Sequence, residues 1–480
     1  MENNGYIKDL LTSFIATSES TIAFSVYDGI QVTDITYRQF CDDILKAAGY
    51  FYHRKIKNQH IAIVAANSYD WMVVFFATLA SGNVVVPMNP SLPNSTIQWQ
   101  CEKADVSVLC GEASVISEFS TLTNIEKFLS FDELANAMPL PLEEIYLAEP
   151  DETLLLMFTS GTTGKSKAAE FTYISIRNCL ANLSLWFDVP GYERWFCVLP
   201  LFHISGLNCI IHFLYGFRTV CLGRGPKYLF MDMPALNPTT ITVVPLILES
   251  ILKVCKNARS SEERIRYFGN NLQRISVCGA TVRPDAVQVM LDQGIAIDVY
   301  YGLTESFGDG IQCAVDTIHT DTIGKPCGNM QCRIQEGEIL LKNDSVMKGY
   351  YKDPEETAKV LKDGWLHTGD IGCFDEDGYF YITGRKKNVI ILPNGENVNP
   401  EEIESQFGEC KDILECMVFS DGKGICADVY TENKPAAADF IKKYNENVPL
   451  YRQVYNVTYS AVPLAKTGSG KIKRKENTYV

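Results

Sequence analysis

A segment rich in hydroxyl groups, glycines and lysines follows an apolar stretch at residues 154–158. Glycines allow successive backbone N–H groups to point at one anion, hydroxyls add donors, and lysines add positive charge. These residue types indicate a phosphate-binding loop, although Gly/Ser/Thr clusters are more often plain polar turns. The candidate phosphate ligands are Thr159, Ser160, Gly161, Thr162, Thr163, Gly164, Lys165 and Lys167.

The tripeptide Gly164-Lys165-Ser166 resembles the end of a P-loop, but two features argue against that motif. The P-loop needs a glycine five positions before its second glycine, and Thr159 stands there. Residues 168–173 also read as a second extended segment, with helical periodicity starting only near residue 174. A P-loop kinase or ATPase is therefore disfavoured, and the loop is expected to lie between two strands.

The composition is that of a large globular chain. Its 480 residues are 46% hydrophobic and 21% charged, which predicts at least two domains. The net charge of −15 argues against a nucleic-acid partner, because such proteins need clustered positive charge.

Cysteine usage and apolar runs indicate the compartment. The 16 cysteines contain no C-x-x-C pair, and the N-terminus has no basic region followed by an apolar core. The longest apolar run, residues 71–88, is interrupted by Ser-Gly-Asn and a proline, so it predicts a buried helix, a turn and a strand. We expect reduced thiols, a cytoplasmic location and no integral membrane segment.

The elements that must position the loop alternate between short apolar runs and helical stretches. This alternation is typical of an α/β fold with parallel sheets covered by helices. The expected strands are residues 61–65, 83–87, 106–109, 154–158, 240–244, 274–277 and 297–300.

The pattern changes after about residue 323. Closely spaced strands, including 337–342 and 378–383, predict a small β subdomain. Beyond residue 387, a small α+β domain is predicted, with helices at 401–407 and 437–444 and hairpin strands at 415–419 and 425–430.

Five further segments follow the loop in a fixed order: LPLFHISG at 199–206, YYGLTES at 300–306, GWLHTGD at 364–370, GRKKNVIILPNGENVNPEEIE at 384–404, and PLAKTGSGKIKR at 463–474. With the loop, they closely resemble the adenylate-forming superfamily of acyl-CoA and aryl-CoA synthetases, peptide-synthetase adenylation domains and firefly luciferase. The resemblance runs from about residue 35 to residue 474. As a set the motifs are highly specific, although each alone is weak.

This resemblance implies an enzyme that joins a carboxylic acid to a thiol in two steps. The acid attacks the α-phosphate of ATP, with Mg²⁺, to give an acyl-adenylate and pyrophosphate, and CoA then takes the acyl group. It also implies an N-terminal domain of residues 1–384, a hinge at 385–389 and a mobile C-terminal domain of residues 390–480. After adenylation that domain would rotate and present the loop 393–397 to a pantetheine thiol.

The resemblance assigns roles around the nucleotide. Glu305, beside Thr304, matches the magnesium carboxylate, and one carboxylate plus phosphates suits Mg²⁺. Tyr301 matches the aromatic residue that packs on adenine, while Gly279 and Ala280 match small residues at the adenine edge. Without the other motifs, each would read as a capping Glu, a core tyrosine or a strand-to-helix turn.

Four residues near the C-terminal domain complete the predicted machinery. Asp370 matches the acid that accepts the ribose hydroxyls, and Arg385 matches the domain-junction arginine near ribose and phosphate. Lys471 matches the lysine that bridges the substrate carboxylate and the α-phosphate, although a basic tail would look similar. Lys387 occupies the hinge position.

The acyl pocket gives the first indication of the substrate. No aspartate follows Phe202, which argues against an amino acid, and His203 matches an aromatic or gating position of acyl- and aryl-CoA synthetases. The other expected lining residues, mostly apolar, are Val244, Gly279, Tyr301 and Gly302.

A fatty or aryl acid is therefore expected, and similarity in the 201–207 segment and in length makes an o-succinylbenzoate–CoA ligase an alternative. A carrier-protein phosphopantetheine could replace CoA as acceptor. A non-catalytic relative is less favoured, because Glu305 and Lys471 are both present.

Overall fold

The computed structural model describes residues 6–159, 166–184, 191–257, 261–279, 282, 284–315, 319, 321–392, 396–466 and 472–474. The chain forms two compact units. The first contains Met1–Gln331 and Leu341–Leu366, and the second contains Cys332–Leu340 and His367–Val480. This division is based on which residues contact one another. The predicted hinge at 385–389 is a statement about motion, which such contacts do not test, so it stays a prediction.

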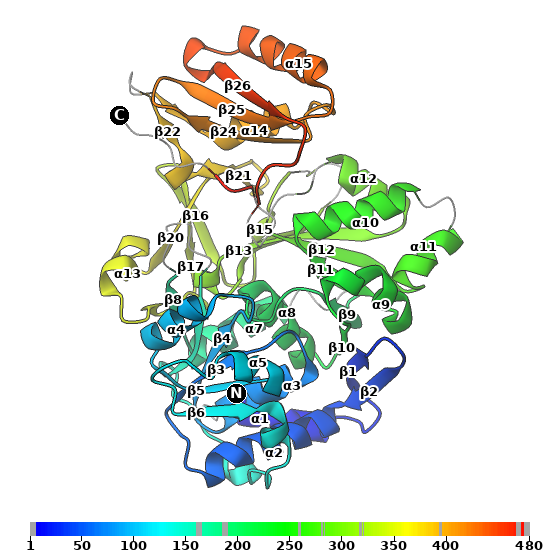
Figure 1. Ribbon diagram of the computed structural model, residues 1–480, viewed down its shortest axis with the longest axis vertical. Coiled ribbons are helices and arrows are strands. Elements are labelled where there is room, and N and C mark those ends of the chain that lie inside the picture. Colours follow the sequence, from blue (N-terminus) through cyan, green and yellow to red (C-terminus); the bar gives the residue numbers. More distant parts are fainter. Residues whose placement is uncertain are drawn as a thin grey trace. The chain divides into compact units, whose positions relative to one another are not determined.

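A seven-stranded sheet carries the phosphate-loop region (Figure 1). Its order is β18-β8-β7-β4-β3-β5-β6; β3 to β7 are mutually parallel, and β8 runs antiparallel to both of its neighbours, β7 and β18. The bounds are β3 His60–Val64, β4 Val84–Met88, β5 Val106–Gly111, β6 Lys127–Ser130, β7 Thr153–Phe158, β8 Ala168–Thr172 and β18 Gly349–Tyr350. The four strands predicted in this region are confirmed, and the loop does lie between two strands, β7 and β8.

A nine-stranded sheet forms the other large sheet, in the order β15-β14-β13-β12-β11-β9-β10-β1-β2. Its bounds are β1 Ile22–Tyr27, β2 Val32–Thr36, β9 Arg194–Cys197, β10 Thr219–Leu222, β11 Thr240–Val243, β12 Arg274–Cys278, β13 Ala296–Gly302, β14 Gly310–Val315 and β15 Lys325–Pro326. The run from β1 through β13 is parallel, and the three predicted strands here are confirmed.

The helices cover these sheets because the strands are apolar on both faces. Strand β7 is buried along its middle four residues, and β11 along its whole length. Figure 1 shows α10 and α12 against the β11–β13 region. The helices of the first unit are α1 Tyr6–Ala16, α2 Tyr37–His53, α3 Tyr69–Ala80, α4 Asn94–Lys103, α5 Ala113–Glu118, α6 Phe131–Ala135, α7 Tyr173–Ser184, α8 Ile204–Tyr215, α9 Leu229–Leu236, α10 Pro245–Asn257, α11 Ser261–Phe268, α12 Pro284–Asp292 and α13 Pro354–Val360.

Local sequence explains where the central helices begin. The hydroxyl of Thr36 accepts a hydrogen bond from Gln39 N, and that of Ser68 accepts one from Trp71 N, so each caps the helix that follows. Helix α3 is buried on all sides from Trp71 onward and is followed by a turn and β4. The predicted helix, turn and strand at 71–88 are therefore confirmed.

A smaller sheet has the order β16-β17-β20-β19, with β21 paired to β20. The bounds are β16 Gln331–Gln335, β17 Glu338–Lys342, β19 Leu361–Lys362, β20 Trp365–Phe374 and β21 Phe380–Arg385. This is the β subdomain expected from the closely spaced strands. The short 3-10 turn η4, Lys386–Asn388, follows β21.

The C-terminal part folds around its own apolar core. Strands β24 Glu415–Ser420 and β25 Ile425–Tyr430 form the predicted hairpin, and β26 Val454–Ser460 adds to β25 in parallel. Helices α14 Pro400–Phe407 and α15 Lys434–Glu446 pack on this sheet through residues such as Ile403 and Ile441. The short pair β22 Ile390–Ile391 and β23 Asn397–Val398 precedes it.

Two observations concern the expected compartment. All 16 cysteines are reduced thiols, and ten of them are buried. In the part of the chain described above, no helix combines the length and apolar character needed to cross a bilayer.

Candidate active site

The carboxyl ends of three neighbouring strands bring predicted pocket residues to one edge of the nine-stranded sheet. Val244 follows β11, Gly279 follows β12, and Tyr301 and Gly302 end β13. Because these strands are parallel, the residues share the sheet edge at which ligands of open α/β sheets usually bind. Tyr301 is buried, whereas Gly279 is exposed and has a φ of +82° that favours glycine.

Gly302 is a glycine for a steric reason. A Cβ atom at this position would lie 2.3 Å from the carbonyl oxygen of Gly308, which is too close for any side chain. The close approach arises because the chain turns back directly after β13 and pairs with itself through β14. Gly302 thus closes the turn that carries the predicted magnesium carboxylate.

That turn, residues 303–309, contains the 3-10 helix η3, Thr304–Ser306. Ser306 holds the turn together, since its hydroxyl accepts from Leu303 N at 3.1 Å and donates to Asp309 O at 2.5 Å. Thr304 and Glu305 are partly exposed, while Ser306 is fully buried. The turn therefore presents Thr304 and Glu305 outward on a rigid base.

A buried carboxylate anchors the end of the same turn. Asp309 is fully buried, and its Oδ2 accepts hydrogen bonds from Asn182 at 2.8 Å, Asn343 at 2.9 Å and Ser345 at 2.8 Å. Burial raises the pKa of Asp309 despite these donors. Two further asparagines extend the network, Asn178 and Asn329. No sequence motif signalled this cluster.

Glu305 itself has one partner of note. The hydroxyl of Tyr350 donates to Glu305 Oε1 at 2.7 Å. Among the described residues, Glu305 Oε2 has no hydrogen-bond partner. The backbone of Glu305 is also fixed, because its carbonyl oxygen accepts from Met347 N at 2.8 Å.

The two ends of the predicted phosphate loop are joined. Thr159 N donates to Lys167 O at 2.8 Å, Lys167 N donates to Thr159 Oγ1 at 3.3 Å, and the Ser166 hydroxyl donates to Thr159 O. The side chain of Lys167 forms an ion pair with Glu356 of α13. The Lys167 contact, with Lys359 contributing, lowers the pKa of Glu356 to about 2.

His203 lies at the start of α8, at its N-cap position. Its ring packs on Phe202 with ring centroids 5.0 Å apart. Burial lowers the pKa of His203, so its imidazole is neutral near pH 7. A neutral, partly buried ring suits the wall of an acyl pocket better than it suits an ion pair.

The predicted ribose residues face each other across a strand pair in the second unit. Asp370 on β20 and Arg385 on β21 occupy paired positions, and Arg385 Nε lies 2.6 Å from Asp370 Oδ1. Asp370 is buried, whereas the Arg385 side chain is 38% exposed. Asp370 N donates to Thr368 Oγ1 at 3.0 Å, which fixes the turn before it.

The predicted hinge residue Lys387 is exposed and lies in the middle of η4. A buried glutamate braces the neighbouring chain: Glu338 accepts from Gly369 N at 2.9 Å and pairs with Lys386 at 3.1 Å. It also lies 3.2 Å from His367 Nδ1. Glu338 therefore ties the predicted ribose-binding segment to the start of the predicted hinge.

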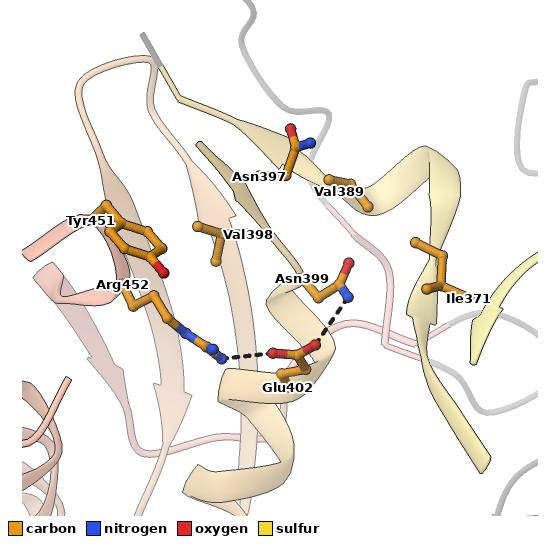
Figure 2. Close-up of a pocket in the computed structure, with 8 residues that line it drawn as sticks. All are labelled: Ile371, Val389, Asn397, Val398, Asn399, Glu402, Tyr451 and Arg452. Atoms are coloured by element: carbon orange, nitrogen blue, oxygen red, sulfur yellow. Dashed lines mark hydrogen bonds and ion pairs between the residues drawn. The ribbon is translucent and has the colours of Figure 1, made fainter. Parts of the chain in front are cut away.

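A pocket of about 220 Å³ lies beside this segment (Figure 2). Within it, Glu402 accepts from Arg452 at 2.7 Å and from Asn399 at 3.1 Å. The lining residues are Ile371, Val389, Asn397, Val398, Asn399, Glu402, Tyr451 and Arg452. Of the predicted nucleotide and catalytic residues that the structure describes, none lines it.

Several predicted residues lie outside the described part of the chain: Ser160, Gly161, Thr162, Thr163, Gly164, Lys165, Ala280, Lys471 and residues 393–395 of the pantetheine loop. Their roles stay predictions.

The donor set at the turn fits magnesium. Over the described ranges, no group of three or more His, Cys, Asp or Glu side chains could hold a metal ion. Magnesium does not require one, because it commonly keeps waters and binds through one or two carboxylates together with substrate phosphates. Glu305, with one carboxylate oxygen unengaged by described residues, could supply such a ligand.

Comparison with known proteins decides the family. Residues 16–351 match the family described as AMP-binding enzyme. The chain belongs to this family. The match covers the predicted phosphate loop, the predicted pocket edge and the Glu305 turn.

Curated relatives extend the similarity over most of the chain. A 2-succinylbenzoate–CoA ligase of Bacillus cereus (strain Q1) is 28% identical over 396 residues, covering 78% of each chain. The enzyme of the same name from Bacillus mycoides (strain KBAB4) is 27% identical over 473 residues, covering 93% of this chain and 94% of that one.

Solved structures show the same fold. An o-succinylbenzoate coenzyme A synthetase (MenE) from Bacillus subtilis, in complex with AMP, has a TM-score of 0.83 at 23% identity, with 97% of both chains covered. ATP-bound MatB from Rhodopseudomonas palustris has a TM-score of 0.84 at 20% identity and the same coverage. The predicted superfamily and the predicted α/β fold class are confirmed.

Proposed function

We propose that this chain is an AMP-forming carboxylate–CoA ligase whose acid is 2-succinylbenzoate. The observation that carries the substrate assignment is the likeness to 2-succinylbenzoate–CoA ligases over as much as 93% of the chain. This choice is narrower than the fatty or aryl acid expected from the sequence. The family match supports the ligase class itself.

The proposed reaction has two balanced steps. A carboxylate oxygen of the acid attacks the α-phosphorus of ATP, the bond to the β-phosphate oxygen breaks, and pyrophosphate leaves. The thiol of CoA then loses its proton and attacks the acyl carbon, and AMP leaves with the electron pair of the broken acyl–oxygen bond of the mixed anhydride. Such chemistry depends on positioning and on charge stabilisation more than on covalent help from the protein.

The roles of individual residues follow as proposals. Glu305 would hold magnesium, which, when bound, neutralises charge on the phosphates. Asp370 would accept the ribose hydroxyls, with Arg385 beside it, and Lys471 would bridge the acid and the α-phosphate. Tyr301, Gly279 and Ala280 would contact adenine, while His203 would border the acyl pocket.

The remaining expectations are also carried as proposals. The reduced state of all 16 thiols supports a reducing compartment such as the cytoplasm. Rotation of residues 390–480 about 385–389, with Lys387 as hinge residue, would let one site serve both steps.

The test is exchange of labelled pyrophosphate into ATP in the presence of Mg²⁺, with 2-succinylbenzoate compared with fatty acids, benzoate and malonate. We expect exchange that depends on acid and metal and is fastest with 2-succinylbenzoate. Adding CoA or a phosphopantetheinylated carrier protein then identifies the thiol. Absence of exchange with every acid, for protein shown to be folded, would contradict the ligase proposal, and preference for another acid would contradict only the substrate.

A further inference from the structure

Tyr350 stands between two predicted elements of the active site. It ends strand β18, which pairs with β8 through Tyr350↔Ala169 and so borders the strand that follows the phosphate loop. The residue is 6% exposed, and its backbone N donates to Thr357 Oγ1 at 2.9 Å. The side chain is therefore fixed at both its base and its ring.

The hydroxyl and the ring of this side chain contact two different residues of the predicted active site. The hydroxyl donates to Glu305 Oε1 at 2.7 Å, and the Nζ atom of Lys167 lies over the ring, 4.8 Å from its centroid. Lys167 is also paired with Glu356, six residues beyond Tyr350 on α13. The proposed metal carboxylate and the lysine at the end of the phosphate loop are thus held by one short segment.

A phenol suits this position because it is a neutral donor. An arginine or lysine at this distance would also orient the carboxylate, but its charge would compete with a metal cation for the same oxygen atoms. Burial, reinforced by the negative charge of Glu305, raises the pKa of Tyr350 far above its usual range. Even a tyrosine hydroxyl with an ordinary pKa of about 10 is protonated at pH 7.

We propose that Tyr350 is a positioning residue that fixes the carboxylate of Glu305 for magnesium and ties it to Lys167 of the phosphate loop. This inference rests on the proposed function, because it takes Glu305 as the metal ligand. Partners that orient a ligating carboxylate without touching the metal typically change metal affinity by about 10- to 100-fold when they are removed.

The chain offers a closely matched control. Tyr146 donates from its hydroxyl to Glu152 at 2.8 Å, and Lys57 Nζ lies over its ring at 4.5 Å from the centroid. It thus has the same triplet of phenol, carboxylate and lysine, outside the predicted site. Tyr350→Phe and Tyr146→Phe each remove one hydroxyl and keep the ring.

The experiment measures Mg²⁺ dependence in two ways for wild type, Tyr350→Phe and Tyr146→Phe. The first is pyrophosphate exchange with the best acid, and the second is binding of a non-hydrolysable ATP analogue as a function of Mg²⁺, which requires no acid. We expect the half-saturating Mg²⁺ concentration of Tyr350→Phe to rise about tenfold or more in both assays, with the maximal rate at saturating Mg²⁺ near that of wild type. Tyr146→Phe should leave both unchanged.

Combining the substitution with Glu305→Gln separates positioning from general loosening. In the Glu305→Gln background, Tyr350→Phe should cause little further change in Mg²⁺ dependence, because the carboxylate it positions is gone. An unchanged Mg²⁺ requirement in Tyr350→Phe, or an equal shift in Tyr146→Phe, would overturn the inference. The wild-type protein could bind Mg²⁺ and the analogue yet fail to exchange pyrophosphate with any of the acids tested. That result would contradict the proposed function and leave the binding test of Tyr350 valid.

Discussion

Two carboxylates that the sequence assigns to ATP, Glu305 and Asp370, are held in opposite ways. Glu305 is partly exposed and accepts from a neutral phenol, whereas Asp370 is buried and paired with the Arg385 guanidinium at 2.6 Å. The phenol orients its carboxylate and leaves the full negative charge in place, while the guanidinium compensates the charge of its partner. The first arrangement suits a cation and the second suits neutral hydroxyl groups.

The contrast shows how the environment can divide labour between chemically similar groups. A carboxylate that binds a metal ion needs its negative charge, so a cationic partner would weaken its affinity for the metal. A ribose ligand needs acceptor geometry, and an arginine can fix that geometry without taking both oxygens.

Glu305→Gln should cause the largest loss. The amide keeps the size of the side chain but removes the negative charge, and loss of one group that stabilises developing charge costs about 100-fold or more in rate. Single-turnover adenylate formation at a fixed, physiological Mg²⁺ concentration measures this. A rate close to that of wild type would show that another residue holds the metal.

Asp370→Asn should cost less, about tenfold in kcat/KM for ATP, because the amide retains one acceptor oxygen. Arg385, at 38% exposure, can regain water when its partner is neutralised, which limits the structural cost. Comparing ATP with 2′-deoxy-ATP and 3′-deoxy-ATP in wild type and variant forms a double-mutant cycle. If removing a ribose hydroxyl lowers kcat/KM by the same factor in the variant and in wild type, Asp370 does not contact the ribose hydroxyls.

Asp309→Asn should have a smaller effect, a few-fold rise in half-saturating Mg²⁺. The amide oxygen lacks the negative charge that strengthens the three hydrogen bonds reaching Asp309 Oδ2, so the turn that carries Glu305 should loosen.

The matched control for this change is Asp232→Asn. Asp232 is equally buried but is bound to Arg224 outside the predicted site. It should lower thermal stability without changing the Mg²⁺ response, and an Mg²⁺ shift in this control would make the Asp309 effect nonspecific.

His212 sets the pH range in which these comparisons hold. It is buried in α8, and burial lowers its pKa to about 4, from an ordinary value of 6.5. Between pH 6.5 and pH 4, His212 is protonated in the unfolded chain but neutral in the folded chain. The free energy of unfolding therefore falls as pH falls from 6.5 toward 4, by about 1.4 kcal/mol per pH unit. Thermal midpoints from pH 7 to pH 5 should fall more steeply for wild type than for His212→Gln, and equal slopes would contradict this origin.

Much of the fold was predictable because local patterns determine it. Strands such as β3 and β7 are continuous apolar runs, and the predicted residues at the ends of β12 and β13 share an edge because parallel strands align their carboxyl ends. Strand β26 was not predicted, and polar residues such as Asn456 and Thr458 dilute its apolar pattern.

The supports of the site were not predictable, because they depend on long-range contacts between ordinary residue types. Tyr350 reaches Glu305 across 45 positions, and Asn182 reaches Asp309 across 127. Neither pair has a spacing in the sequence that would reveal the contact. A tyrosine beside Gly349 looks like an ordinary residue at the end of a strand. Sequence motifs identify the residues that would touch a ligand. The residues that hold those side chains in place are found only from the three-dimensional structure.

The most direct test of the contrast is a titration of Mg²⁺ in pyrophosphate exchange, run side by side for Glu305→Gln and Asp370→Asn at pH 7.5 with saturating acid. We predict that excess Mg²⁺ restores part of the activity of Glu305→Gln, whose half-saturating Mg²⁺ concentration is raised. Asp370→Asn should show the Mg²⁺ dependence of wild type and a raised KM for ATP. Equal Mg²⁺ shifts in the two variants, or a shift only in Asp370→Asn, would contradict the division of roles between the two carboxylates.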